Sequence, residues 1–305
     1  MSISLSRRTS TGQYIREIDG LRFFAIMPVV IWHLAVRLGD LHPESTVGPL
    51  YSWLAIGAKG VQIFFIISGF ILLLPYAQYY NGIRDRPSTR PFYLRRITRL
   101  EPPYLIAVIV IGSAQFLRGV DHIGRFFAGL GYSHALFFGD TNPFFSIAWT
   151  LEIEIQFYLL VPIIAKVFLL RDPIARRAIV VSFIVLLSSA DISLFNAPSH
   201  LNLFGHLPWF GVGILLVDCY INDWQSPSTR TTVWSSVSAI SAIMLIIVFR
   251  FGLPGMESTL DTVVPPLLGF LVFAGVFRSP RVGRAVTWGP LPIIGGMAYS
   301  IYLLH

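Results

Sequence analysis

Nine apolar runs dominate this sequence, and each is long enough, or nearly so, to cross a lipid bilayer as a helix. The hydrocarbon core of a bilayer is about 30 Å thick, so a spanning helix needs roughly 20 predominantly apolar residues. The runs are Phe23–Leu38, Leu54–Tyr76, Pro103–Leu117, Trp149–Leu170, Ala178–Phe195, Leu203–Tyr220, Val233–Phe249, Leu260–Phe277 and Leu291–His305. They predict an all-α, polytopic membrane bundle of about nine to ten transmembrane helices.

The composition favours a membrane protein over a soluble one. Of the 305 residues, 54% are hydrophobic and only 13% are charged, whereas soluble domains carry about 25% charged residues. No long hydrophilic segment divides the chain, so we predict one integral membrane domain over residues 1–305. The single cysteine, Cys219, excludes an intrachain disulfide. The arginines lie in short loops between apolar runs, which argues against a nucleic-acid-binding face.

The distribution of basic residues predicts the orientation. The predicted orientation depends on whether the aromatic stretch Phe126–Phe138 crosses the membrane. If it does, the basic clusters Lys166–Arg177 and Arg278–Arg284 both lie outside. If it stays outside and the N-terminus is cytoplasmic, 18 of the 23 Lys and Arg residues lie inside, as the positive-inside rule requires. The outer side then keeps Arg37, Lys59, Arg118, Arg125 and Arg250. We therefore predict a bacterial cytoplasmic (inner) membrane protein with Phe126–Phe138 as an outer re-entrant or interfacial segment.

The last apolar run, Leu291–His305, is unusually short. Its fifteen residues give about 22 Å of helix, which is less than the thickness of the bilayer core. The sequence alone therefore predicts that the last transmembrane helix is truncated.

The first apolar run carries the first candidate functional residues. Arg22 and His33 are eleven residues apart, so on a helix they share one face and are separated by about 16 Å. Arg22 is then at the inner mouth of the membrane and His33 is deep inside it. Because ionisable groups at membrane depth are costly, they are candidates for function by default.

Three further polar residues are predicted at a depth near that of His33. Glu154 lies near the outer end of its span, Ser68 lies near mid-depth, and His305 lies in the outer half of the membrane. We expect these four side chains to meet in one buried polar chamber. A carboxylate beside an imidazole fixes its tautomer and raises its basicity, so Glu154 and His33 are predicted to act together as a general base on a hydroxyl.

A second group of residues points to a phosphate on the cytoplasmic side. Arg96 and Arg99 are three residues apart and share a helix face, with Arg22 predicted nearby. Guanidinium groups suit phosphate oxygens, so these arginines are predicted to hold a phosphate-bearing donor. By contrast, Glu152 is predicted to face water at the outer interface. His42, His122, His134, His200 and His206 are predicted to be solvated in or near outer loops, with His206 a potential acceptor contact.

Five motifs in order give the chain a resemblance to the integral-membrane acyltransferase-3 family over essentially its whole length. The first is Ile18-Asp-Gly-Leu-Arg22 followed, after ten residues, by His33. The others are Gly60–Phe70 ending in Ser-Gly-Phe, Arg96-x-x-Arg99 before two prolines, Trp149–Tyr158 containing Glu154, and Tyr299–His305. Gln62 stands where the family often has an acidic residue, and Glu152 replaces a small one.

The resemblance implies transfer of an acyl group, usually acetyl from cytoplasmic acetyl-CoA, to a hydroxyl of a carbohydrate or related acceptor at the outer face. It implies a bilayer, acyl-CoA and the acceptor as partners, with no metal and no permanently bound cofactor. Under this interpretation His33 is the base, oriented by Glu154 or Asp19, and Arg22, Arg96 and Arg99 hold the donor. Substrate contacts are expected from Ser68, Trp149, Tyr302 and His305, with Ser68 or Tyr302 as oxyanion donor.

Two other functions stay open from the sequence. His33 and Glu154 could form the proton relay of a proton-coupled transporter or exporter. The short last helix also allows an inactive, truncated remnant.

Overall fold

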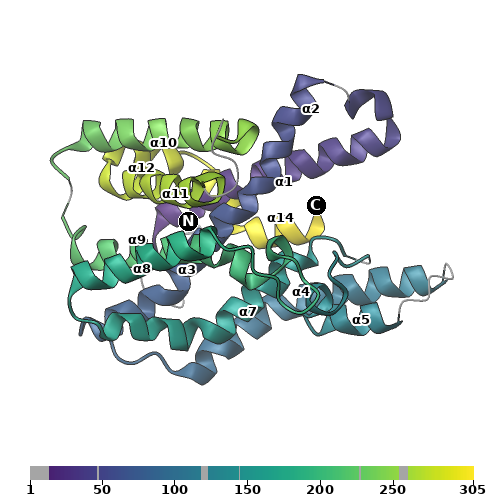
Figure 1. Ribbon diagram of the computed structural model, residues 1–305, viewed down its shortest axis with the longest axis horizontal. Coiled ribbons are helices and arrows are strands. Elements are labelled where there is room, and N and C mark those ends of the chain that lie inside the picture. The colour runs from purple at the N-terminus through teal and green to yellow at the C-terminus, as the bar shows by residue number, and fades with distance from the viewer. Residues whose placement is uncertain (1–13, 47, 118–122, 144, 227, 254–259) are drawn as a thin grey trace, which may run out of the picture.

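The chain folds as the helical bundle predicted from its apolar runs. The computed structural model describes residues 14–46, 48–117, 123–143, 145–226, 228–253 and 260–305, and this part contains helices and one isolated bridge but no strand. Figure 1 shows their arrangement. The helices are α1 Arg16–Leu41, α2 Pro49–Leu54, α3 Gly60–Tyr80, α4 Thr89–Leu117, α5 Ile123–Leu130, α6 His134–Phe138, α7 Ala148–Ile164, α8 Pro173–Ser188, α9 Leu203–Asn222, α10 Thr231–Phe251, α11 Leu260–Arg278, α12 Pro280–Val286, α13 Leu291–Gly296 and α14 Ala298–Leu304. Short 3₁₀ segments follow or precede several of them, at Pro43–Thr46, Ala55–Lys59, Ala165–Leu169 and Ser199–Leu201.

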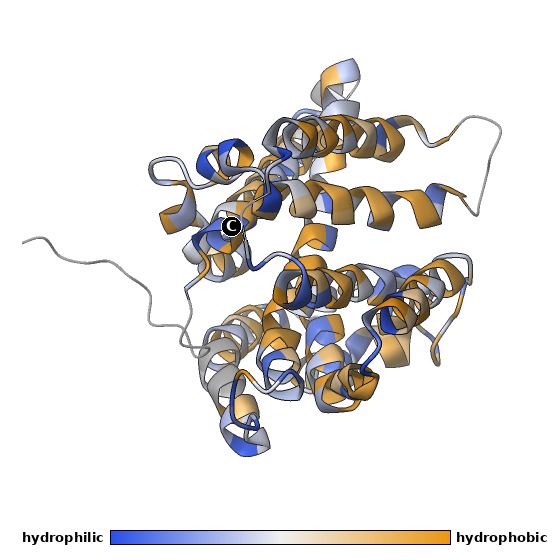
Figure 2. Ribbon diagram, turned by 90° about the vertical axis from the view of Figure 1, so that its left-hand side faces the viewer, coloured by the Kyte–Doolittle hydropathy of each residue, from blue (hydrophilic) through white to orange (hydrophobic). Residues whose placement is uncertain are grey.

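Five helical stretches in the described residues are long and apolar enough to cross a membrane. They are α1, the stretch Pro49–Tyr80 that includes α3, and α9, α10 and α11. Figure 2 shows apolar residues along these helices and hydrophilic residues mainly at helix ends and in connections. The prediction of an all-α integral membrane protein is confirmed. The other predicted spans coincide with α7, α8, α13–α14 and the apolar part of α4, Pro102–Leu117.

The stretch Phe126–Phe138 is divided between two short helices. α5 has eight residues and α6 has five, which correspond to about 12 Å and 8 Å of helix. Both are far shorter than a bilayer core. This geometry fits an outer segment that does not cross the membrane.

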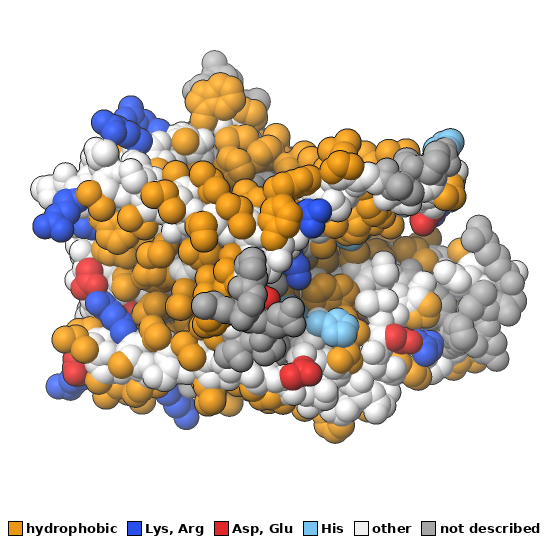
Figure 3. Space-filling view, turned by 45° about the horizontal axis from the view of Figure 1, so that its top comes forward, with side chains coloured by type: hydrophobic (Ala, Val, Ile, Leu, Met, Phe, Trp, Pro, Cys, Tyr) orange, Lys and Arg blue, Asp and Glu red, His pale blue; other side chains and the backbone are white. Residues whose placement is uncertain are grey.

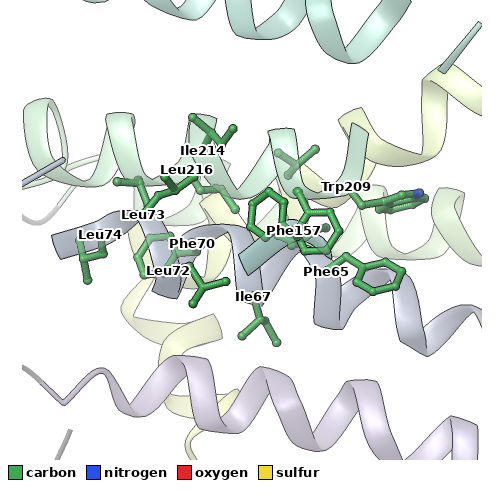
Figure 4. Packing of buried hydrophobic residues seen from close by; sticks show 14 of the residues in the cluster. Phe65, Ile67, Phe70, Leu72, Leu73, Leu74, Phe157, Trp209, Ile214 and Leu216 are labelled. Atoms are coloured by element: carbon green, nitrogen blue, oxygen red, sulfur yellow. The ribbon is translucent and has the colours of Figure 1, made fainter. Parts of the chain in front are cut away.

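The centre of the core is the contact between α3 and α9. Figure 4 shows α3 side chains, among them Phe65, Phe70 and Leu73, pointing toward residues of α9 and toward Phe157 of α7. The rings of Phe157 and Phe210 stack with centroids 3.8 Å apart. The ring of Phe65 on α3 lies 4.9 Å from that of Phe210. Because van der Waals packing is the main force between helices in lipid, these rings join the three helices that carry Ser68, Glu154 and His206.

Two glycines allow α3 and α9 to approach closely. A Cβ at Gly69 would lie 2.4 Å from the carbonyl oxygen of Phe210, and one at Gly213 would lie 2.5 Å from that of Ile66. Small residues at such crossings are typical of membrane helices. Gly69 and Gly213 therefore have a packing role, and Ser68 lies directly beside this close crossing of α3 and α9.

The end of the bundle at which α9 connects to α10 is held by buried charges. Asp218 of α9 accepts hydrogen bonds from Nε of Arg176 at 2.6 Å and from Nε of Arg177 at 2.5 Å, both from α8. Arg176 and Asp218 are almost fully buried, so each neutralises a charge that would otherwise be costly. In Figure 3, Lys and Arg gather toward the left-hand edge, the end at which α9 connects to α10 in Figure 1.

The first turns of α1 are clamped between α12 and α13. A Cβ at Gly20 would lie 2.1 Å from the carbonyl oxygen of Val286, and one at Gly295 would lie 1.8 Å from that of Asp19. Backbone therefore touches backbone on both sides of α1. This clamp fixes the N-terminal end of the helix whose C-terminal half carries His33.

The clamp predicts that alanine substitutions at two adjacent glycines of α13 have very different effects on the stability of the protein. Gly295→Ala forces the helices apart and should destabilise the protein by about 1–3 kcal/mol, the usual cost of overpacking. Gly296→Ala meets its nearest atom, Oδ2 of Asp19, at 3.7 Å, which is ordinary contact. Thermal unfolding of the detergent-purified variants measures both. Equal melting temperatures for the two variants would contradict the clamp.

Candidate functional site

The site begins with two histidines from opposite ends of the chain. Nδ1 of His33, on α1, lies 2.5 Å from Nε2 of His305, which follows α14. Their rings stack with centroids 4.7 Å apart and an interplanar angle of 21°. The predicted meeting of His33 and His305 is therefore seen, and it takes the form of a direct hydrogen bond between two imidazoles.

The hydrogen bonds of this pair determine which nitrogen carries each hydrogen. Nδ1 of His305 lies 2.7 Å from the carbonyl oxygen of Tyr302, and a carbonyl oxygen only accepts, so this Nδ1 carries a hydrogen. Nε2 of a neutral His305 is then an acceptor, and Nδ1 of His33 donates to it. The lone pair of a neutral His33 is left on Nε2. The structure thus sets up His33 Nε2 as a base.

Tyr302 connects the histidine pair to α7. Its hydroxyl lies 2.7 Å from Oγ1 of Thr150 and 3.3 Å from the carbonyl oxygen of Ile147. Because Tyr302 is buried, this polar contact pins α14 to the first turn of α7. The position of His305 beside α1 therefore depends on the start of α7.

Glu154 has a partner other than the one predicted. Its Oε1 accepts a hydrogen bond of 2.7 Å from the hydroxyl of Ser68, whereas the described hydrogen bond of His33 goes to His305. The expectation that Glu154 orients His33 by direct contact is therefore corrected, and His305 occupies that place. Glu154 and Ser68 form a second polar pair, between α7 and α3.

The two predicted oxyanion donors already use their hydroxyl hydrogens. Ser68 donates to Glu154, and Tyr302 is hydrogen-bonded to Thr150 and Ile147. A hydroxyl has one hydrogen to give. In this arrangement neither side chain is available to stabilise an oxyanion, so that expectation does not fit the structure.

Asp19 lies near the N-terminal end of α1, paired with Arg22 in an ion pair within one turn. Asp19 is buried and the Arg22 side chain is 20% exposed. His33 is fourteen residues further along the same helix, which is about 21 Å. The expectation that Asp19 orients His33 is therefore wrong; its carboxylate instead orients the guanidinium of Arg22.

Three predicted residues cannot be placed as side chains. Arg96 and Arg99 belong to α4, but their side chains lie outside the described residues, and His122 lies outside them altogether. Their roles remain predictions.

Glu152 is the carboxylate that the sequence interpretation assigned wrongly. It is 1% exposed rather than water-facing. Its oxygens accept hydrogen bonds from the backbone N–H of His134 at 3.2 Å and of Ala135 at 2.9 Å. Those are the first N–H groups of α6, where a negative charge is favoured. Glu152 thus attaches the outer segment to α7, two residues before Glu154. The rule that selected Glu154, a carboxylate at membrane depth, also selects Glu152.

His206 is also buried instead of solvated. It lies in the second turn of α9, its Nε2 donates to the carbonyl oxygen of His200 at 3.1 Å, and its ring is 5.5 Å from that of Trp149. Nδ1 of His206 has no hydrogen-bond partner among the described residues. His134 is likewise buried, whereas His42 and His200 are exposed as expected. Neighbouring rings of Phe65 and Trp149 account for the burial of His206.

The arrangement supplies a base in the C-terminal half of α1 and a cation near its N-terminal end. Between Arg22 and His33 the sequence Phe23–Trp32 is entirely apolar. The described residues contain no cluster of three or more His, Cys, Asp or Glu side chains placed to hold a metal ion. Removal of a proton from a hydroxyl is the chemistry that His33 Nε2 can perform directly.

Comparison with known proteins gives one family and a consistent set of relatives. The profile of an acyltransferase domain, acyltransferase-3, matches residues 15–305. A candidate peptidoglycan O-acetyltransferase of Bacillus subtilis strain 168, YrhL, is 26% identical, over 98% of this chain and 49% of its own length. The O-acetyltransferase OatA of Staphylococcus aureus strain NCTC 8325 is 25% identical, over 96% of this chain and 50% of its own. The chain spans about half the length of these curated relatives. No solved structure matches.

The contacts of Glu152 predict its effect on stability. Glu152→Ala leaves two buried backbone N–H groups without their acceptor, which should cost about 1–3 kcal/mol. Glu152→Gln keeps one acceptor oxygen and should cost less. Melting temperatures in detergent should fall in the order wild type, Glu152→Gln, Glu152→Ala. An Ala variant as stable as the wild type would contradict the anchoring role.

Proposed function

The chain belongs to the acyltransferase-3 family of membrane acyltransferases, and from this premise we propose that it is an O-acetyltransferase. The donor is acetyl-CoA, bound from the cytoplasm. The acceptor is a carbohydrate hydroxyl at the outer face of the inner membrane, and the N-terminus is cytoplasmic. The hydrogen bond between His33 and His305 is the observation that carries the proposal, because it leaves a basic nitrogen on the membrane-embedded first helix.

The reaction follows from the tautomers of the pair. His33 Nε2 takes the proton of the acceptor hydroxyl while the hydroxyl oxygen attacks the thioester carbonyl. A C–O bond forms, the C–S bond breaks, and the CoA thiolate recovers the proton from His33. While His33 is protonated, its Nδ1–H donates to His305 Nε2, and the Tyr302 carbonyl holds His305 in the orientation that allows it. His305 is therefore a positioning residue.

The donor's phosphates are placed at the inner end of α1. Arg22 is only partly exposed, and its ion pair with Asp19 fixes its position at the clamp of α12 and α13. The remaining guanidinium N–H groups of Arg22 suit a phosphate oxygen. We assign Arg96 and Arg99 to the same donor on the strength of their sequence motif. The flexible thioester arm then runs along the apolar segment Phe23–Trp32 toward His33.

The acceptor is assigned from the relatives and from the outer end of α7 and α9. The Bacillus subtilis relative is named for peptidoglycan, so a surface polysaccharide such as peptidoglycan is the proposed acceptor. Trp149 and His206 lie together at this outer end. A partly exposed indole beside a buried acceptor nitrogen suits a sugar, which offers an apolar ring face and hydroxyl donors.

Replacement of the base tests the proposed function directly. His33→Ala should abolish acetyl transfer, because no other described side chain occupies the place of His33 Nε2. Mass spectrometry of surface glycans from cells that express equal amounts of each protein measures the acetyl esters. His200→Ala is the matched control, since His200 is exposed and its only described contact with His206 is through its backbone. Normal acetylation by His33→Ala would refute the mechanism.

The positioning role of His305 gives a graded prediction. His305→Ala removes the acceptor for His33 Nδ1–H and should lower the transfer rate tenfold or more, within the usual range for a general-base contribution. In His305→Gln the side-chain oxygen reaches roughly the place of Nε2 and should restore part of the rate. Initial rates with acetyl-CoA in membrane vesicles distinguish the two. Equal rates for both variants would show that the hydrogen bond has no catalytic part.

A further inference from the structure

A shallow groove lies at the inner end of the bundle, outside the residues assigned so far. It has a volume of about 510 Å³ and is lined by Arg281, Arg284, Ala285 and Trp288. These residues come from α12 and the turn that follows it. The groove is therefore built by the short connection between the last long apolar helix and α13.

The groove carries two guanidinium groups without a carboxylate partner. Among the described residues, neither Arg281 nor Arg284 forms an ion pair, and the one described side-chain hydrogen bond of the two runs from Nε of Arg284 to the carbonyl oxygen of Pro280 at 3.2 Å. That bond orients the guanidinium and leaves its terminal N–H groups outward. Two such groups on one helix turn suit phosphate oxygens.

The third wall of the groove is an indole. Trp288 is 71% exposed and lies beside the two arginines. A flat aromatic surface next to guanidinium groups matches a nucleobase next to its phosphates, since every base has a π-face that stacks on an aromatic ring. A lipid headgroup would use the arginines but would not need a stacking plane.

The frame of the groove is rigid and adjoins α1. Ser279, at the start of α12, is buried and shares a 2.7 Å hydrogen bond with Ser235 of α10. At the other end of α12, the carbonyl oxygen of Val286 touches Gly20 of α1. The groove is thus fixed beside the turn of α1 that holds Asp19 and Arg22, where the proposed donor path begins.

We propose that this groove binds the adenine nucleotide end of the acyl donor. Trp288 stacks on the base, and Arg281 and Arg284 hold phosphates, so that the thioester arm starts next to Arg22. The inference rests on the proposed function for its ligand, but the nucleotide site itself is defined by the chemistry of these three side chains.

The test uses a nucleotide that carries no acyl group. Adenosine 3′,5′-bisphosphate is titrated into the purified chain in neutral detergent by calorimetry. The double variant Arg281→Gln/Arg284→Gln and the variant Trp288→Leu should each weaken binding at least tenfold. Arg230→Gln is the control, because Arg230 is an exposed arginine on the same side of the membrane and lies outside the groove. It should bind as the wild type does.

A second titration separates a nucleotide from a lipid headgroup. Phosphatidylglycerol in mixed micelles offers a phosphate and no base, so its binding should not depend on Trp288. Equal nucleotide affinity in all four proteins, or loss of lipid binding alone in the arginine variant, overturns the proposal. So does a wild-type chain that binds no nucleotide.

The titration and the transfer assay together distinguish a failure of the groove proposal from a failure of the proposed function. Nucleotide binding that needs Arg281, Arg284 and Trp288, in a chain that transfers no acetyl group, would refute the proposed function and leave the groove intact. Acetyl transfer that is unchanged in the groove variants, with nucleotide affinity also unchanged, would refute the groove and leave the function intact.

Discussion

A bilayer offers no hydrogen-bond partner to a buried polar group, so every polar side chain within it must find one in the bundle. This constraint explains the arrangement of the site. Ser68 is paired with Glu154, His33 with His305, and Tyr302 with Thr150. Each pair joins a different set of helices, and together they bring α1, α3, α7 and α14 to one place. The chemistry and the fold therefore depend on the same few contacts.

The sequence was sufficient for the helices, but not for the pairs that the polar residues form. Apolar length predicted the helices, and residue depth predicted His33, Glu154 and His305 in the outer half of the membrane and Ser68 near mid-depth. Which of them touch depends on how the helices are rotated and crossed, and no single periodicity encodes that. Judged by depth alone, Glu154 and His305 are equally good partners for His33. Only the packing of the helices decides which of the two touches it.

The two carboxylates that were misassigned show the same limit. Asp19 was chosen as a partner for His33 because of its charge, although the helix rise already separates the two residues. In the structure Asp19 instead forms an ion pair with Arg22 in its own turn. Glu152 was assigned to water, whereas in the structure its carboxylate accepts hydrogen bonds from backbone N–H groups of α6. Backbone donors at a helix start carry no residue signature, so a sequence cannot reveal them until the neighbouring helix is placed. The close contacts at Gly20 and Gly295 could not be predicted from the sequence either, because they too are made with backbone atoms of neighbouring helices.

The apolar stretch of α1 is compatible with the proposed group transfer and offers no proton relay along α1 itself. A relay needs titratable groups spaced along the whole path, but ten consecutive apolar residues separate Arg22 from His33, a distance of about 16 Å along the helix. Buried Ala25, Ile26 and Val29 of this stretch pack within the core. A proton cannot cross such a segment by hopping between side chains of α1, whereas a long flexible donor held by its phosphates at one end can bring a thioester to the other. The separation of cation and base is thus a requirement of the proposed reaction.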